Sequence, residues 1–145
     1  ELSGFDTHAQ QRGPVNAQSR ALTALDGGIA AFRTEMGPAW KDTVMVIITE
    51  FGRTVAMNGT GGTDHGSGMA AFLAGGAVKG GRVIADWPGL APAALYQGRD
   101  LKPTMDLRAA LKGVLSDQLQ IADSALNASV VPDSAGVKAM AGLIA

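Results

Sequence analysis

TVMVIIT, residues 43–49, is a continuous run of apolar and mainly β-branched residues. Such a run is typical of a strand that is covered on both faces in a parallel sheet. A helical pattern precedes it from about Asn16 to Met36, with apolar residues at three- and four-residue steps. A long helix followed by a buried strand is half of a βαβ unit. The sequence therefore predicts an α/β domain with a mainly parallel sheet flanked by helices.

The segments around this unit predict four further features. Gly13-Pro14 indicates a turn before the first helix. Residues 69–74 and 82–84 are short apolar segments, and each predicts a strand. A second amphipathic helix is expected from near Thr104, which can serve as its N-cap, with Asp106 in the first turn. We expect residues 1–125 to form the α/β part and residues 126–145 to form a loosely structured tail.

The composition sets bounds on the class of protein. The chain has 145 residues, of which 46% are hydrophobic and 17% charged, so it suits one modest domain with a core. Its net charge is -1, with no basic stripe, which argues against nucleic acid as a partner. It contains no cysteine, and no apolar run reaches the about 18 residues of a membrane span.

The beginning of the chain suggests a piece of a longer protein. The sequence starts at Glu1 without a methionine and reaches the motif GFDTH at residues 4–8 almost at once. We therefore expect a missing N-terminal half, which would be a partner of this piece in the intact protein.

Both histidines of the chain have an aspartate close by, in Asp6-Thr7-His8 and in Asp64-His65. Imidazole together with carboxylate suits zinc, iron or manganese, whereas carboxylate alone suits magnesium or calcium. In an extended segment, Asp6 and His8 project to the same side because the period is two. The alternative interpretation is that these are turn and capping residues with surface histidines. Metal binding is the hypothesis that both pairs favour together.

Glu50 and Arg53 follow the predicted buried strand, at the end where open parallel sheets place their ligands. A carboxylate there needs a cation or good solvation, so Glu50 is either a metal ligand or the partner of a base such as Arg53. The guanidinium of Arg53 can instead bind a phosphate or sulfate group of a substrate.

Six motifs occur in one order, and together they resemble a known family. They are GFDTH (4–8), TEFGRT (49–54), NGTGGTDHG (58–66), GGAVKGG (75–81), DWPGL (86–90) and RDL (99–101). In this order they closely resemble the C-terminal half of bacterial domain-of-unknown-function 1501 (DUF1501) proteins, over nearly the whole chain to about residue 121. Members often carry a twin-arginine export signal, which implies a periplasmic or exported location.

That family in turn resembles the alkaline phosphatase and sulfatase superfamily, whose fold is a doubly wound α/β sandwich that binds two metals. The resemblance implies that Asp6, His8 and His65 hold one metal. It places Glu50 at the second metal, where Phe51 stands in place of the superfamily's histidine. The same resemblance makes Asp64 either a further ligand or a residue that orients His65.

The resemblance also implies a function, namely hydrolysis of phosphate or sulfate esters. The cofactor would be one or two divalent metals (zinc, manganese, magnesium or calcium), and the substrate would be an anionic ester that Arg53 clamps. The nucleophile would lie in the missing half, so the fragment alone is expected to be inactive. One alternative is a non-catalytic exported binding or structural protein that keeps the scaffold, and another is metal binding without turnover.

Overall fold

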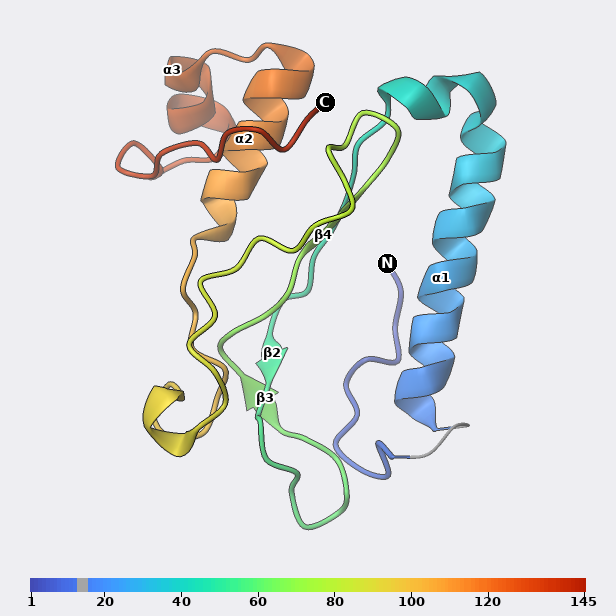
Figure 1. Ribbon diagram of the computed structural model, residues 1–145, viewed down its shortest axis with the longest axis vertical. Helices are drawn as coiled ribbons and strands as arrows, with labels where there is room; N and C mark the ends of the chain where they lie inside the picture. Colours follow the sequence, from blue (N-terminus) through green and yellow to red (C-terminus); the bar gives the residue numbers. More distant parts are fainter. Residues whose placement is uncertain (13–15) are drawn as a thin grey trace. The chain divides into compact units, whose positions relative to one another are not determined.

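The computed structural model describes residues 1–12 and 16–145 (Figure 1). The turn expected at Gly13-Pro14 lies outside the described residues. The chain divides into two compact units. The first unit consists of Glu1–Gly37, Thr49–Ala70 and Trp87–Pro103, and the second consists of Pro38–Ile48, Ala71–Asp86 and Thr104–Ala145.

Apart from the helices α1 and α2, both units consist of short elements and long connections (Figure 1). The α-helices are α1 (Ala17–Met36), α2 (Leu107–Leu119) and α3 (Asp123–Ala125). The other helical turns are η1 (Gly37–Asp42), η2 (Pro92–Ala94) and η3 (Leu126–Val130). The strands are β1 (Met45–Ile47), β2 (Gly52–Arg53), β3 (His65–Gly66) and β4 (Phe72–Ala74). None of the helices in the described part of the chain is long and apolar enough to cross a membrane.

The prediction of a mainly parallel sheet is wrong. The strands form two antiparallel pairs instead, β1 with β4 and β2 with β3. In the first pair, Val46 lies opposite Leu73. Only residues 45–47 of the predicted strand are extended and paired, and all three are half-buried rather than covered on both faces. An apolar run indicates burial, but it does not specify the direction of the neighbouring strand, and the TVMVIIT stretch was too short to decide it.

The helix predicted from about Asn16 to Met36 is confirmed as α1, and the residues at its two ends explain where it begins and ends. Asn16 is the N-cap, and its side chain accepts a hydrogen bond of 2.8 Å from the Ser19 N–H. Gly37 ends α1 with a φ of 49°, a left-handed value that glycine adopts without steric cost. The apolar stripe expected on this helix is only partly buried, as the 51% exposure of its member Leu22 shows.

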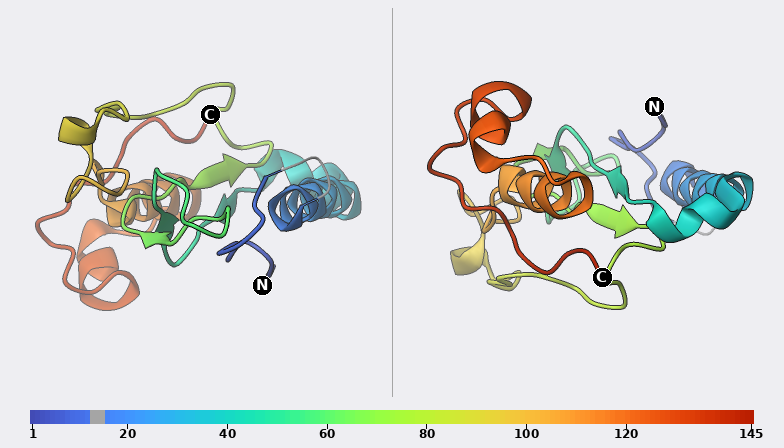
Figure 2. Two further views of the ribbon diagram at one scale, coloured as in Figure 1. Left: turned by 90° about the horizontal axis from the view of Figure 1, so that it is seen from below. Right: turned by 90° about the horizontal axis from the view of Figure 1, so that it is seen from above.

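The N-terminal segment runs alongside the first half of α1, as both Figure 1 and Figure 2 show. A side-chain carbon at Gly4 would meet the Cβ atom of the buried Ala21 at 3.5 Å. Gln11 donates a hydrogen bond of 2.8 Å to Gln18 in the first turn of the helix. These contacts tie the segment that carries Asp6 to α1.

Two further predictions from the sequence need correction. Residues 82–84 do not form a strand, and Val83 is 91% exposed. The second helix begins at Leu107, and Asp106 rather than Thr104 is its N-cap. The Asp106 carboxylate accepts the Arg108 N–H at 2.9 Å and also pairs with the Arg108 guanidinium. Since one side chain satisfies both groups, it fixes the start of the helix two residues later than expected.

Lys112 on α2 is the largest fully buried side chain of the second unit, with 1% exposure. Its ammonium group is surrounded by oxygen atoms of the C-terminal segment. They belong to Asn127 at 2.7 Å, the Val137 carbonyl at 2.7 Å, Asp123 at 2.9 Å and the Ser134 carbonyl at 3.2 Å. A buried ammonium is stable only when such acceptors replace water, so this cation organises residues 123–137 around α2.

Replacing Lys112 with methionine, which is similar in length, is expected to destabilise the chain by about 2–4 kcal/mol. Each buried acceptor left without a donor costs about 1–3 kcal/mol. Urea unfolding measures the loss, and amide exchange should accelerate across residues 123–137. The exposed Lys102, changed to methionine, is the matched control. Equal stability of both variants would contradict the assigned role of Lys112.

The ion pair between Asp123 and Lys112 should make the stability of the fold depend on pH. The hydrogen bond from Lys112, and then the one from Asn127, lowers the pKa of Asp123 below its ordinary value of 3.8. A lowered pKa in the folded state stabilises the fold above pH 3.8, and this stabilisation is lost as the pH falls through the folded pKa. The Tm difference between wild type and Asp123→Asn is therefore expected to shrink on acidification from pH 6 to about pH 2. A difference that stays constant over this range would contradict the pairing.

Candidate metal centre

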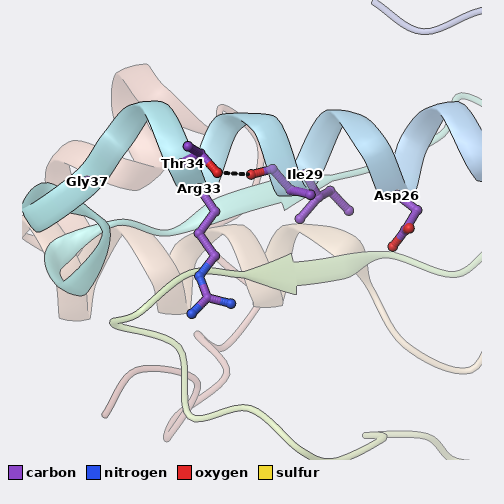
Figure 3. Close-up of a pocket in the computed structure, with 6 residues that line it drawn as sticks. Asp26, Ile29, Arg33, Thr34 and Gly37 are labelled. Atoms are coloured by element: carbon purple, nitrogen blue, oxygen red, sulfur yellow. Dashed lines mark hydrogen bonds between the residues drawn. The ribbon is translucent and has the colours of Figure 1, made fainter.

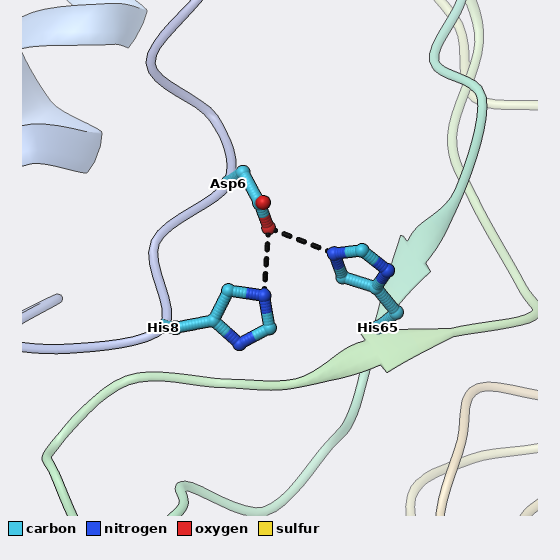
Figure 4. A group of neighbouring side chains, drawn as sticks. All are labelled: Asp6, His8 and His65. Atoms are coloured by element: carbon cyan, nitrogen blue, oxygen red, sulfur yellow. Dashed lines mark hydrogen bonds and ion pairs between the residues drawn. The ribbon is translucent and has the colours of Figure 1, made fainter.

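Three side chains with metal-binding atoms converge in the first unit: Asp6, His8 and His65, here called the His–Asp cluster. One ligand atom from each lies within 4.8 Å of the other two. Asp6 Oδ1 is 3.0 Å from His8 Nε2 and 2.9 Å from His65 Nε2, and both rings turn toward this carboxylate (Figure 4). The three side chains are about half exposed, between 48% and 53%. Solvent, ions and small solutes can therefore reach the cluster.

The β2–β3 pair positions His65. In its register Arg53 lies opposite His65, and Gly52 lies opposite Gly66. The glycines permit an unusually close approach of backbones, because a Cβ atom on Gly66 would lie 2.7 Å from the Arg53 carbonyl carbon. A Cβ atom on Gly52 would lie 1.8 Å from the carbonyl oxygen of Gly68. The glycine-rich sequence around the second histidine therefore serves close packing.

The N-terminal segment positions Asp6 and His8 by lying against the loop of residues 58–64. Ala9 bridges to Gly61, and backbone hydrogen bonds run from Gln10 N to Thr60 O at 3.1 Å and from Thr63 N to Thr7 O at 3.2 Å. This close packing requires glycine at position 62, because a Cβ atom there would lie 2.2 Å from the His8 carbonyl carbon. Two motifs that lie more than fifty residues apart in the sequence thus form one site.

Arg53 orients Asp6. Its Nη1 donates to Asp6 Oδ1 at 2.5 Å, while Nε and Nη2 donate to the hydroxyl and the carbonyl of Thr63 at 3.0 and 2.6 Å. The hydrogen bond from Arg53, followed by that from His65, lowers the pKa of Asp6. The carboxylate is therefore ionised at neutral pH, which is the form that binds a metal.

Asp64 contacts His8 rather than His65. Its Oδ1 atom lies 3.1 Å from His8 Nδ1 and accepts a hydrogen bond of 3.0 Å from the Asn58 amide. The hydrogen bond from Asn58, and then that from His8, lowers the pKa of Asp64. The two carboxylates thus lie at opposite nitrogens of the His8 ring, Asp64 at Nδ1 and Asp6 at Nε2.

Two residues that shape the site, Phe51 and Asn58, were not predicted from the sequence. The Phe51 ring stacks on the His65 ring, with 3.9 Å between centroids and 15° between planes. Asn58 holds its own loop, since its side-chain oxygen accepts the backbone N–H groups of Thr60 and Gly62 at 3.1 and 3.0 Å. The Asn-Gly start of that loop was a recognisable signal, because asparagine commonly bonds to backbone two residues ahead in turns.

Asp100 anchors the chain just beyond β3. It is fully buried, and its Oδ2 atom accepts hydrogen bonds from the Ser67 N–H at 3.0 Å and the Ser67 hydroxyl at 3.1 Å. Arg99 Nε lies 2.9 Å from its other oxygen. Because Ser67 follows His65 by two residues, this anchor limits how far His65 can move.

Glu50 is not a member of the His–Asp cluster, and its side chain is exposed. Its role as a ligand of a second metal, which the resemblance implies, stays a prediction. A separate hollow lies along α1, lined by residues of that helix and its C-cap (Figure 3). Asp26 and Arg33 are among its lining residues, but no member of the His–Asp cluster is.

The types of donor, and the two spacings that involve Asp6, fit a divalent transition-metal ion. Two ligand atoms about 2.0–2.1 Å from a zinc ion lie about 2.9–3.4 Å apart, for bond angles between 90° and the tetrahedral value. The distances of 2.9 and 3.0 Å from Asp6 to the two imidazoles match this spacing. Three protein ligands also leave coordination positions for water or substrate, as in catalytic rather than structural sites.

The fold and the cluster define a chain of helices and small antiparallel sheets that carries a solvent-open candidate metal centre. The chain belongs to the family described as Protein of unknown function (DUF1501), whose sequence profile matches residues 1–133. The family predicted from the six motifs is thereby confirmed. No curated protein and no solved structure matches the chain. Its function must therefore be inferred from the site.

Proposed function

We propose that the His–Asp cluster binds one divalent metal ion and that this centre serves the hydrolysis of phosphate or sulfate esters. The observation that carries the proposal is the convergence of two imidazoles on one carboxylate, with ligand atoms within 4.8 Å of one another. Two nitrogen ligands favour zinc, manganese or iron over magnesium and calcium, which prefer oxygen ligands. The ion would supply Lewis acidity to an ester oxygen.

The residues around the cluster have defined roles in this proposal. Arg53 holds the Asp6 carboxylate in its ionised form and brings a fixed positive charge to the edge of the cluster. Only three of the five N–H groups of a guanidinium are needed for its contacts with Asp6 and Thr63. The remaining two can donate to the anionic part of an ester, which supports a role for Arg53 in substrate binding.

The choice of phosphate and sulfate esters has a second support in the sequence motifs. The resemblance of these motifs to phosphatases and sulfatases does not extend to a parallel sheet, so the support that they give is limited to the ligand residues and Arg53. A nucleophile outside these residues stays a prediction. For that reason the activity test is made on the complete gene product.

The test is hydrolysis of p-nitrophenyl phosphate and p-nitrophenyl sulfate by the complete gene product, with zinc or manganese added. We expect turnover of at least one ester that is lost on chelation and in His65→Ala, but retained in the exposed control Lys102→Ala. Stoichiometric metal without turnover would overturn the hydrolase and favour a non-catalytic binding protein. Absence of bound metal would overturn the metal centre as well.

A further inference from the structure

His8 has a carboxylate oxygen on each of its two ring nitrogens. Asp64 Oδ1 lies 3.1 Å from Nδ1 in a hydrogen bond, and Asp6 Oδ1 lies 3.0 Å from Nε2. A neutral imidazole has one N–H and one lone pair. It can therefore donate to only one of the two carboxylates, and its lone pair then faces the other one. With its N–H on Nδ1, the neutral ring turns its Nε2 lone pair toward the Asp6 carboxylate, and only a protonated ring would donate to both oxygens.

Backbone and side-chain hydrogen bonds hold Asp64 on the Nδ1 side of His8. Asp64 is fixed by its neighbours: its backbone N–H donates to the Thr54 hydroxyl at 3.0 Å, and its carbonyl accepts from the Thr54 N–H at 2.9 Å. Asn58 donates both to the Asp64 carboxylate at 3.0 Å and to the His8 carbonyl at 2.9 Å. One amide group thus connects the carboxylate to the backbone of the histidine that it faces.

On its Nε2 side, His8 faces the other residues of the His–Asp cluster. There Asp6 also contacts Arg53 and His65, and the ligand atoms of the cluster meet. A metal ion at this position would relieve the repulsion between the Nε2 lone pair and the Asp6 carboxylate. Metal-bound histidines commonly donate their second ring N–H to a carboxylate, which fixes the tautomer and the direction of the ring.

We propose that Asp64, held by Asn58, is a positioning residue that takes the Nδ1 proton of His8 in a hydrogen bond and so presents Nε2 to the metal. This inference rests on the proposed metal centre and deepens it. It assigns Asp64 an orienting role toward His8, whereas the sequence suggested direct ligation or orientation of His65.

The test combines zinc affinity with the tautomer of His8 in the metal-free chain. Asp64→Ala is expected to raise the Kd for zinc by about 10–100-fold, and Asp64→Asn, which keeps an acceptor oxygen, by less. Nitrogen-15 NMR at about pH 9, where imidazole is neutral, should show the Nδ1–H tautomer in wild type and its loss in Asp64→Ala. Asp26→Ala on α1 removes the same charge and should change neither readout.

The outcomes separate this inference from the metal centre itself. Wild type that binds zinc, with unchanged affinity and tautomer in Asp64→Ala, would overturn the role of Asp64 and leave the centre intact. Wild type that binds no zinc would overturn the centre, and the inference with it. Circular dichroism of each variant identifies a folding defect, and Asp64→Asn then provides the comparison in a folded chain.

Discussion

Replacing His8 or His65 with alanine is expected to raise the Kd for zinc by at least about 100-fold. Each change removes one of three ligands, and the loss of an outer partner of a ligand alone already costs about 10–100-fold. The chain has only two histidines, so the double variant has no imidazole left to substitute for them. Calorimetric titration of the metal-free chain with zinc measures the change.

Glu50→Gln is the informative comparison for the histidine variants. Glu50 was expected from the sequence to be a ligand, yet it lies outside the His–Asp cluster. Its replacement should leave zinc affinity within about twofold of wild type, because no ligand of the cluster is lost. Equal affinities for the wild type and the two histidine variants would remove the cluster from consideration as a metal site.

Gly62→Ala is expected to disrupt the cluster without changing any ligand. The new Cβ atom would lie 2.2 Å from the His8 carbonyl carbon and 2.4 Å from the Ala9 nitrogen, and backbone atoms cannot rotate away as a side chain can. The N-terminal segment must therefore move off the loop and carry Asp6 and His8 with it. We expect destabilisation by about 1–3 kcal/mol and a loss of most zinc affinity.

The same loop provides a matched control at Gly59. A Cβ atom there would meet nothing within 4 Å, and its backbone lies outside the left-handed region. Gly59→Ala should therefore retain the Tm and zinc affinity of wild type. Thermal unfolding and zinc titration of the two variants give the comparison. Identical behaviour of Gly62→Ala and Gly59→Ala would contradict the close packing that positions His8.

The local elements could be predicted from the sequence better than their pairing. The first helix follows from its three- and four-residue apolar steps and from Asn16, an N-cap that acts within a few residues. Strand direction depends on which distant segment pairs with β1, and the apolar run carries no such information. The pairing of Val46 with Leu73 joins two segments that β2 and β3 separate in the sequence, so the prediction of a parallel sheet was wrong.

For the candidate site, too, the types of residue could be predicted from the sequence, but their individual contacts could not. The Asp-x-His and Asp-His motifs predicted which side chains would meet, and Asp6, His8 and His65 do converge in the His–Asp cluster. Which histidine Asp64 contacts depends on the loop that Asn58 closes, and the contact between Phe51 and His65 depends on the register of β2 with β3. Such contacts follow from tertiary packing, which a single sequence does not specify.

Zinc K-edge X-ray absorption of the zinc-loaded chain tests the metal centre most directly, because it reports the atoms bound to the ion. The expected spectrum contains nitrogen and oxygen ligands at about 2.0–2.1 Å, with the outer-shell scattering of two imidazole rings. In His65→Ala the imidazole contribution should fall to one ring. A spectrum of oxygen ligands alone, without imidazole scattering, would contradict zinc binding by Asp6, His8 and His65.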